Sequence, residues 1–219
     1  MPSVTVENYL KQVYLEQQQV GEELVPMGRL AAAMGVTPGS ATSMVKALAD
    51  AKLLDYAPRG GVRLTREGTR LALQVLRRHR LIELFLVEVL KLDWSEVHDE
   101  AEELEHAISE KLLARIDEHL GHPDTDPHGD PIPPATGAPQ PQTLTSLVDA
   151  VEGRPLTIAR VADQDPAFLQ FADRHGLTPG VGVTITARDP AADAVTVQPD
   201  GRTPVTLGLA AAAKILAQT

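Results

Sequence analysis

The 219-residue sequence contains no cysteine, which excludes disulfide bonds and thiolate metal ligands. Aromatic residues make up 3% of the chain and hydrophobic residues 43%, so a core must be built mainly from Leu, Val, Ala and Ile. No apolar run reaches the roughly 18 residues of a transmembrane helix. The first ten residues lack the basic and then apolar layout of a signal peptide. We therefore expect a cytoplasmic protein without a membrane partner.

Positive charge is scarce overall, because the net charge is −10. Such a balance argues against nucleic-acid binding, since phosphate contacts need Lys and Arg. The distribution reverses this argument: residues 1–80 hold 11 Lys and Arg against 7 Asp and Glu, whereas residues 81–219 hold 9 against 23. We expect the first part to meet an anion and the second to meet cations.

The order of elements expected near the N-terminus is typical of a winged helix-turn-helix. Helical spacing of apolar residues predicts three helices, over residues 5–19, 27–34 and 39–51. Thr37 would cap the third helix, with Pro38 in its first turn. A hairpin over residues 53–64 follows as the wing, and Thr65 would cap a helix that ends near residue 90.

The third helix and the hairpin offer side chains suited to DNA. Small hydroxyls and cations can contact phosphates and base edges. The candidates are Arg29, Thr37, Gly39, Ser40, Thr42, Ser43, Lys46, Arg59 and Arg63. The hydroxyls could equally solvate an ordinary helix, so the pattern alone leaves both interpretations open.

Histidines and carboxylates lie one helical turn apart in two neighbouring segments. The residues are His79, Glu83, His98, Glu102, Glu105 and His106. We expect a single helix over residues 94–120, capped by Ser95, to present the last four on one side. Carboxylate oxygens suit hard divalent cations, and imidazole adds affinity for first-row transition metals, so the set favours Mn²⁺ or Fe²⁺. A solvated acidic face is the alternative.

The rest of the sequence changes character twice. Residues 121–143 contain seven prolines and no periodicity, which predicts a linker in which His122 and His128 are solvated. Alternating apolar residues beyond it predict a small, mostly β barrel. Its expected strands are 156–162, 181–187, 194–198 and 203–207, with a helix over 166–175 and a last helix or turn over 208–217.

Several segments resemble the diphtheria toxin repressor family, to which the manganese transport regulators belong. RRHRLIELFL (77–86) and KLDWSEVHDEAEELEHAISEKLLARI (91–116) carry the specific HDEA…EH signature. The likeness extends to residues 7–18, 31–48, 129–133 and 177–180, and so covers nearly the whole chain. It implies a multidomain α+β protein. The implied parts are a winged helix-turn-helix (1–70), a helical dimerisation and metal-binding domain (71–128), a proline-rich linker (129–143) and a C-terminal SH3-like, FeoA-like small β-barrel (144–219).

The resemblance also implies two neighbouring metal sites on the helices of the dimer interface. His79, Glu83 and His98 would form one site. Glu102, Glu105 and His106 would form the other. Glu102 stands where iron-type members have cysteine, which favours Mn²⁺, with Fe²⁺ as the alternative.

Some positions depart from the family pattern. Asn8 stands where the family usually has Met or Asp, and Lys11 stands where the short manganese regulators have a further carboxylate. From the C-terminal domain, Asp165 is a candidate ligand, and Gln170 is a second one. Asp165 is equally well explained as a helix N-cap before Pro166.

These features predict a metal-dependent repressor of metal uptake or homeostasis genes, and not an enzyme. It would bind a palindromic double-stranded DNA operator as a homodimer, with the divalent metal as co-repressor. A metalloenzyme remains an alternative and would need a substrate cleft beside an open coordination position. A winged-helix regulator that senses an organic ligand is the other alternative and would need an apolar cavity between its helices.

Overall fold

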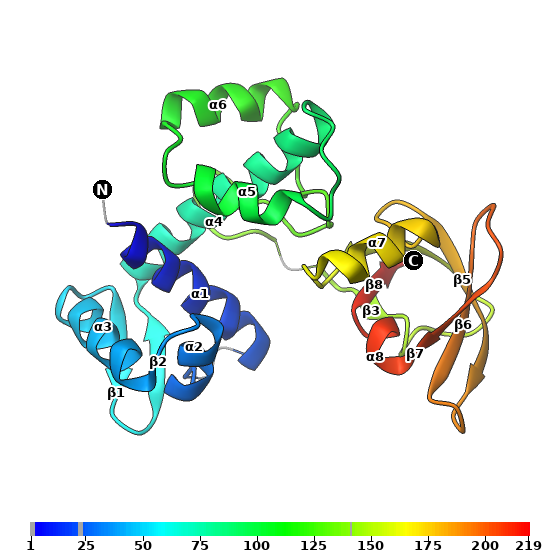
Figure 1. Ribbon diagram of the computed structural model, residues 1–219, viewed down its shortest axis with the longest axis horizontal. Coiled ribbons are helices and arrows are strands. Elements are labelled where there is room, and N and C mark those ends of the chain that lie inside the picture. The colour runs from blue at the N-terminus through cyan, green and yellow to red at the C-terminus, as the bar shows by residue number, and fades with distance from the viewer. Residues whose placement is uncertain (1–2, 22–23, 141) are drawn as a thin grey trace. The chain divides into compact units, whose positions relative to one another are not determined.

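The computed structural model describes residues 3–21, 24–140 and 142–219 (Figure 1). The chain forms two compact units, one of Met1–His79 with Pro133–Ala138, and one of Arg80–Ile132 with Pro139–Thr219. The boundary between His79 and Arg80 falls inside one continuous helix, α4 (Arg66–Glu88). Within the described residues, no helix combines the length and apolar character needed to cross a bilayer.

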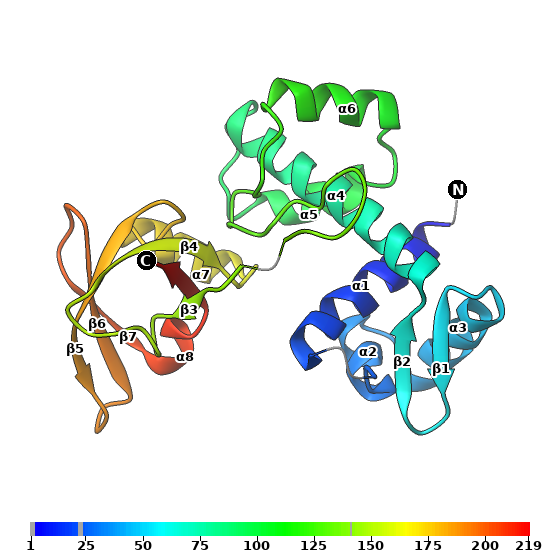
Figure 2. The same cartoon turned by 180° about the vertical axis from the view of Figure 1, so that it is seen from behind.

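The N-terminal unit is a winged helix-turn-helix, as expected (Figure 2). Its elements before α4 are α1 (Val4–Val20), α2 (Met27–Ala33), α3 (Pro38–Asp50), β1 (Leu54–Ala57) and β2 (Gly61–Leu64). The two strands form an antiparallel hairpin. Leu10 and Val13 of α1 share one buried core with Val45 and Leu48 of α3, which fixes α3 against α1.

Local capping explains where these helices begin. The Thr37 hydroxyl accepts a hydrogen bond from Ser40 N at 3.2 Å at the start of α3. The Thr65 hydroxyl accepts one from Gly68 N at 3.1 Å at the start of α4. Gly68 also lies so close to the wing that a Cβ there would be 2.0 Å from the Leu53 carbonyl oxygen. The first turn of α4 is therefore packed directly against the backbone before β1.

The single helix expected over residues 94–120 is wrong. The structure has α5 (Val97–Leu104) and α6 (Glu110–His119), separated by a turn. Ser109 causes the restart, because its hydroxyl accepts a hydrogen bond from Leu112 N at 3.2 Å as the N-cap of α6. Ser95 does not cap α5: its hydroxyl donates to Asp93 Oδ1 at 2.5 Å instead.

The C-terminal part is a six-stranded antiparallel sheet, with the expected SH3-like character, in the order β3 (145–146), β8 (215–218), β4 (155–161), β5 (182–189), β6 (194–199) and β7 (205–208). The tail expected as a helix or turn contains a strand as well, because Ile215 and Ala217 point into the core. The elements are β3 (Thr145–Ser146), β4 (Pro155–Val161), α7 (Pro166–Arg174), β5 (Gly182–Asp189), β6 (Ala194–Pro199), β7 (Val205–Gly208), α8 (Leu209–Ala212) and β8 (Ile215–Gln218).

The first half of the proline-rich segment is packed rather than solvated. His122 is exposed, but His128 is 0% exposed, so the expectation of a solvated His128 is wrong. The Asp126 carboxylate accepts hydrogen bonds from the backbone of His128 and Asp130, at 2.8 and 2.9 Å, and closes a tight loop. Val161 N at the end of β4 donates to His128 O at 2.8 Å. This loop therefore joins the helical part to the sheet.

Candidate metal centre

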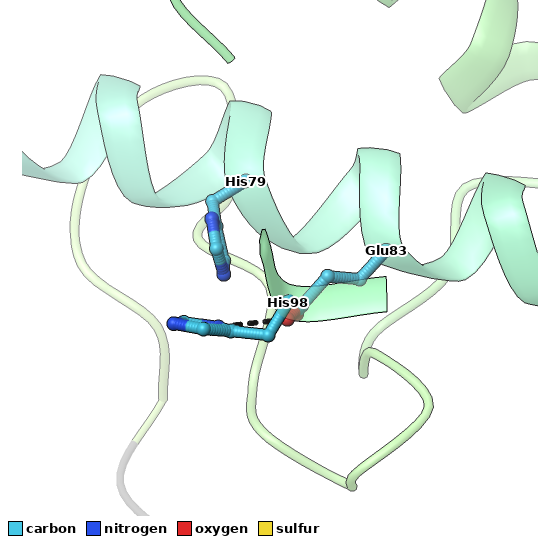
Figure 3. A group of neighbouring side chains, drawn as sticks. All are labelled: His79, Glu83 and His98. Atoms are coloured by element: carbon cyan, nitrogen blue, oxygen red, sulfur yellow. Dashed lines mark ion pairs between the residues drawn. The ribbon is translucent and has the colours of Figure 1, made fainter. Parts of the chain in front are cut away.

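Three potential ligands from α4 and α5 face one another (Figure 3). His79 and Glu83 lie one turn apart on α4, and His98 lies near the start of α5. One ligand atom from each lies within 4.8 Å of the others, and His98 Nδ1 is 3.5 Å from Glu83 Oε1. His79 and Glu83 are buried, whereas the His98 side chain is 38% exposed. The structure thus brings together the three residues expected to form one site.

The other expected group is arranged differently from the prediction. Glu102 and Glu105 lie with His79 in a group whose ligand atoms are all within 4.8 Å of one another. Glu105 is the C-cap of α5, and His106 follows it in the turn, so only Glu102 of the three expected residues lies within the helix. His106 Nε2 contacts Glu105 Oε1 at 3.2 Å. His98 Nε2, 3.8 Å from Glu102 Oε1, connects this group to the first.

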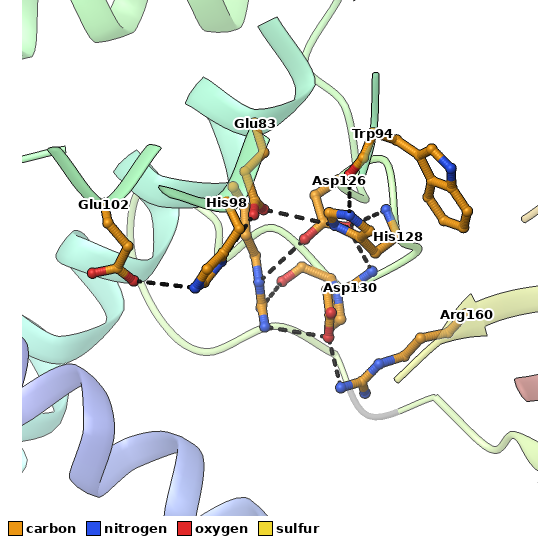
Figure 4. Close-up of polar contacts among 10 residues, drawn as sticks. Glu83, Trp94, His98, Glu102, Asp126, His128, Asp130 and Arg160 are labelled. Carbon is orange, nitrogen blue, oxygen red and sulfur yellow. Dashed lines mark hydrogen bonds and ion pairs between the residues drawn. The ribbon is translucent and has the colours of Figure 1, made fainter. Parts of the chain in front are cut away.

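A third group was missed from the sequence. Glu83, Asp126 and His128 are all buried, and their ligand atoms lie within 4.8 Å of one another (Figure 4). His128 Nδ1 is 4.0 Å from Glu83 Oε2 and 3.9 Å from Asp126 Oδ1. The run Asp-Pro-His-Gly-Asp at 126–130 was the available signal, because Asp before a turn commonly bonds the backbone two residues on.

The buried carboxylates are only partly neutralised by the protein. Burial raises the pKa of Asp126 well above its ordinary value of 3.8, and the nearby carboxylates of Asp130 and Glu83 raise it further. Arg80 opposes this shift, with Nε 3.6 Å from Asp126 Oδ2 and Nη2 3.3 Å from Asp130 Oδ1. Arg160 of β4 also contacts Asp130, at 2.6 Å (Figure 4).

The donor set fits a divalent cation of the first transition row. It consists of carboxylate oxygens and imidazole nitrogens, which suit Mn²⁺ and Fe²⁺. His128 Nδ1 is buried and has no hydrogen-bond partner among the described residues. A buried polar atom normally has such a partner, so this nitrogen is available to coordinate.

The remaining candidate ligands lie in different parts of the structure and have different contacts. Asn8 lies on α1, and its Oδ1 is buried without a hydrogen-bond partner among the described residues. Lys11 is buried on the same helix. Asp165 is the N-cap of α7, since it accepts from Phe168 N at 2.9 Å, and it is exposed. Gln170 donates to Ser95 at 3.4 Å.

The candidate DNA-binding side chains differ in how freely they can meet a ligand. Seven of them are exposed or half-buried: Thr37, Gly39, Ser40, Thr42, Ser43, Lys46 and Arg59. Arg29 is ion-paired to Glu16, and Arg63 is paired to Asp55 at 3.1 Å. Arg59 has a φ of +67° at the hairpin tip. Hydroxyls and Lys46 dominate the exposed face of α3.

Family models match three consecutive segments of the chain. Residues 1–62 match the iron dependent repressor N-terminal DNA binding domain. Residues 65–134 match the iron dependent repressor metal binding and dimerisation domain, and residues 145–219 match the FeoA domain.

Individual proteins match over most of their length. The iron-dependent repressor of Mycobacterium leprae is 31% identical over 219 residues, which cover 93% of this chain and 92% of that protein. The diphtheria toxin repressor of Corynebacterium glutamicum is 33% identical over 130 residues, covering 59% of this chain and 56% of its own.

Solved structures agree in fold. A manganese-dependent transcriptional repressor in complex with manganese has a TM-score of 0.88 and 38% identity, covering 98% of this chain and 99% of its own. The repressor ScaR with bound Zn²⁺ has a TM-score of 0.80 and 31% identity, with full coverage of both chains. On sequence and structure, the chain belongs to the diphtheria toxin repressor family of metal-dependent transcriptional repressors.

Proposed function

We propose that this repressor senses Mn²⁺ and controls genes of metal uptake or homeostasis. In this proposal the Mn²⁺-loaded protein binds a palindromic operator as a homodimer in the cytoplasm. The observation that carries the proposal is the buried Glu83, which belongs both to the His79–Glu83–His98 group and to the Glu83–Asp126–His128 group. Oxygen and imidazole donors without any thiolate favour Mn²⁺ over softer metals.

The ligands would come from separate segments. His79, Glu83 and His98 would hold one ion, together with Asp126 and His128 of the 126–130 loop. Glu102, Glu105 and His106 would hold another, with Asn8 from α1. Asp165 is better explained as the cap of α7, and Gln170 as a contact to Ser95.

Coordination would fix how these segments lie relative to one another. A bound cation supplies positive charge among buried carboxylates and fixed bonds to several side chains. His79 and Glu83 orient α4, whereas His98 and Glu102 orient α5. Without a cation the carboxylates repel one another, so the same chain samples looser arrangements, and metal shifts the population.

In the homodimer, the DNA-facing residues of each subunit would contact one half of the operator. α3 presents Ser40, Ser43 and Lys46 to the major groove, and Arg59 of the hairpin reaches the backbone or minor groove. In a homodimer, two copies of α3 must lie about 34 Å apart to enter successive major grooves. We assign residues 1–70 to DNA binding, 71–128 to dimerisation and metal binding, 129–143 to the linker and 144–219 to the SH3-like domain.

The test uses a duplex selected from a random-sequence pool by the wild-type protein in the presence of Mn²⁺. Duplex affinity should rise at least about tenfold on adding Mn²⁺ and fall back with EDTA. Glu83→Gln should abolish the rise, because one substitution removes a ligand from two groups. Glu88→Gln, at the exposed end of the same helix, should leave it intact.

Two results would contradict the proposal. If the duplex affinity of the wild-type protein did not change with Mn²⁺ or EDTA, a metal-dependent repressor would be excluded. An anaerobic titration in which Fe²⁺ produces the same rise at a lower free concentration than Mn²⁺ would assign the protein to iron, as in the iron-dependent relatives.

A further inference from the structure

We infer that Glu7 and Arg78 are positioning residues that transmit metal binding on α4 to the DNA-reading helix through α1. This inference rests on the proposed function. It concerns a buried ion pair that contacts neither the metal nor DNA in that proposal. Both residues belong to the same compact unit of the chain.

The pair is a close contact between distant parts of the sequence. Arg78 Nη2 donates to Glu7 Oε1 at 2.9 Å, across 71 positions of the chain. Their side chains are 8% and 9% exposed, so water screens the pair little. Removing one partner of a buried pair leaves the other charge uncompensated, which is strongly unfavourable. The contact therefore resists movement of α1 relative to α4 near Glu7 and Arg78.

The position of the pair matters because each member adjoins a candidate ligand. Glu7 precedes Asn8 on α1, and Arg78 precedes His79 on α4. Asn8 Oδ1 is buried and makes no hydrogen bond to any described residue, so no such bond fixes where it lies. Holding Glu7 against Arg78 fixes the backbone that carries Asn8 relative to the backbone that carries His79.

α1 in turn is tied to every part of the DNA-binding unit. Its core residue Val13 shares a hydrophobic cluster with Val45 of α3. Gln17 Oε1 accepts a hydrogen bond from Leu64 N of β2 at 3.0 Å, and Glu16 is ion-paired to Arg29 of α2. A displacement of α1 therefore displaces α3 and the wing with it. This continuous set of contacts is a physical route for coupling the two sites.

The same helix provides a matched control pair. Glu67 and Arg70 form an ion pair at 2.6 Å in the first turns of α4, but their side chains are 55% and 53% exposed. Both partners lie on one helix, three residues apart, so this pair cannot link α4 to α1. Its loss should leave coupling unchanged.

The experiment measures coupling rather than affinity alone. Binding to the Mn²⁺-selected duplex is measured in Mn²⁺ and in EDTA. The ratio of the dissociation constant in EDTA to that in Mn²⁺ is then compared among variants. We expect Glu7→Gln to reduce this ratio at least tenfold. Arg78→Lys should reduce it by a smaller factor, since lysine keeps the positive charge but lacks the planar guanidinium with its paired N–H donors. Glu67→Gln should keep the wild-type ratio. By linkage, the gain in Mn²⁺ affinity on adding duplex should fall by the same factor.

The outcomes separate positioning from mere stabilisation. A pair that only stabilises the fold would lower the melting temperature of Glu7→Gln and leave the ratio unchanged, which would overturn the inference. If Glu7→Gln does not fold, Arg78→Lys decides: a wild-type ratio overturns the inference and a reduced ratio supports it. A wild-type protein with no response to Mn²⁺ overturns the proposed function first, and this inference with it.

Discussion

The Asp126 carboxyl group combines full burial with two carboxylate neighbours, Asp130 and Glu83. Each of these factors disfavours the charged form of Asp126, and the positive charge of Arg80 offsets them only in part. The native protein without metal therefore holds a proton on Asp126 more tightly than the unfolded chain does. A cation that binds here must displace that proton, so metal binding at this residue should release a proton and become stronger as the pH rises.

Stability should therefore fall with rising pH in the absence of metal. The folded pKa of Asp126 lies above the unfolded value near 3.8, so stability is lost as pH rises from that value through the folded pKa. Asp126→Asn keeps the oxygen that caps the loop and removes this loss. We expect the variant, in EDTA at pH 7.5, to be more stable than wild type.

Urea unfolding in EDTA at pH 5 and pH 7.5 checks this expectation. Wild type and Asp126→Asn should differ less at the lower pH. A variant that is less stable than wild type at pH 7.5 would contradict it. Adding Mn²⁺ should stabilise wild type and have a smaller effect on the variant.

At the level of elements, the starts of α3 and α4 could be predicted because each carries its own capping signal. Thr37 with Pro38 marks α3, Thr65 marks α4, and apolar spacing marks the buried faces. The break between α5 and α6 could not be found in the same way. Apolar residues keep helical spacing across it, and periodicity reports which face is buried rather than where the backbone ladder stops.

The site was predicted in part for a related physical reason. His79 and Glu83 are one turn apart on one helix, so their proximity is local. Asp126 and His128 reach Glu83 only through the tertiary path of a proline-rich loop, whose composition indicated exposure. Burial of that loop depends on Val161 N binding the His128 carbonyl, a contact between positions 33 residues apart.

Two helical glycines should respond oppositely to alanine. A Cβ at Gly68 would be 2.0 Å from Leu53 O, so Gly68→Ala forces the wing and α4 apart. We expect it to cost at least about 2 kcal/mol of stability, as overpacking against fixed backbone does. Gly28 in α2 has no atom within 4 Å of its added Cβ, so Gly28→Ala should stabilise by about 0.5–1 kcal/mol. Thermal unfolding measures both, and equal effects of the two substitutions would contradict the packing argument.

Across the whole molecule, charge is divided unevenly along the chain. The excess of cations lies in residues 1–80, and four of the acids there are ion-paired to Arg29, Arg63, Arg70 and Arg78. In the proposed function, phosphate contacts would therefore come from few side chains, among them Lys46 and Arg59. Residues 81–219, with 9 Lys and Arg against 23 Asp and Glu, carry a net negative charge that repels a polyanion.

The salt dependence of DNA binding should reflect this uneven charge. Lys46→Ala should weaken binding to specific and random duplexes alike and reduce the slope of log K against log salt by about 1 per bound copy. Lys111→Ala, on the exposed face of α6, should leave the slope unchanged. Titrations from 50 to 300 mM salt measure both. Equal slopes for wild type and Lys46→Ala would remove Lys46 from the DNA interface.

The single tryptophan of the chain, Trp94, stacks on His128 with ring centroids 5.4 Å apart. Its backbone carbonyl is also hydrogen-bonded to His128 Nε2 at 2.9 Å. Trp94 thus stands beside the loop that carries Asp126 and His128, and its indole also packs against the core of the C-terminal sheet. The protein therefore contains a native fluorophore at the junction of its candidate metal centre and its SH3-like domain. Emission from this one residue could report occupancy of that centre, because a paramagnetic ion such as Mn²⁺ bound there would lie close enough to quench it, without any added label.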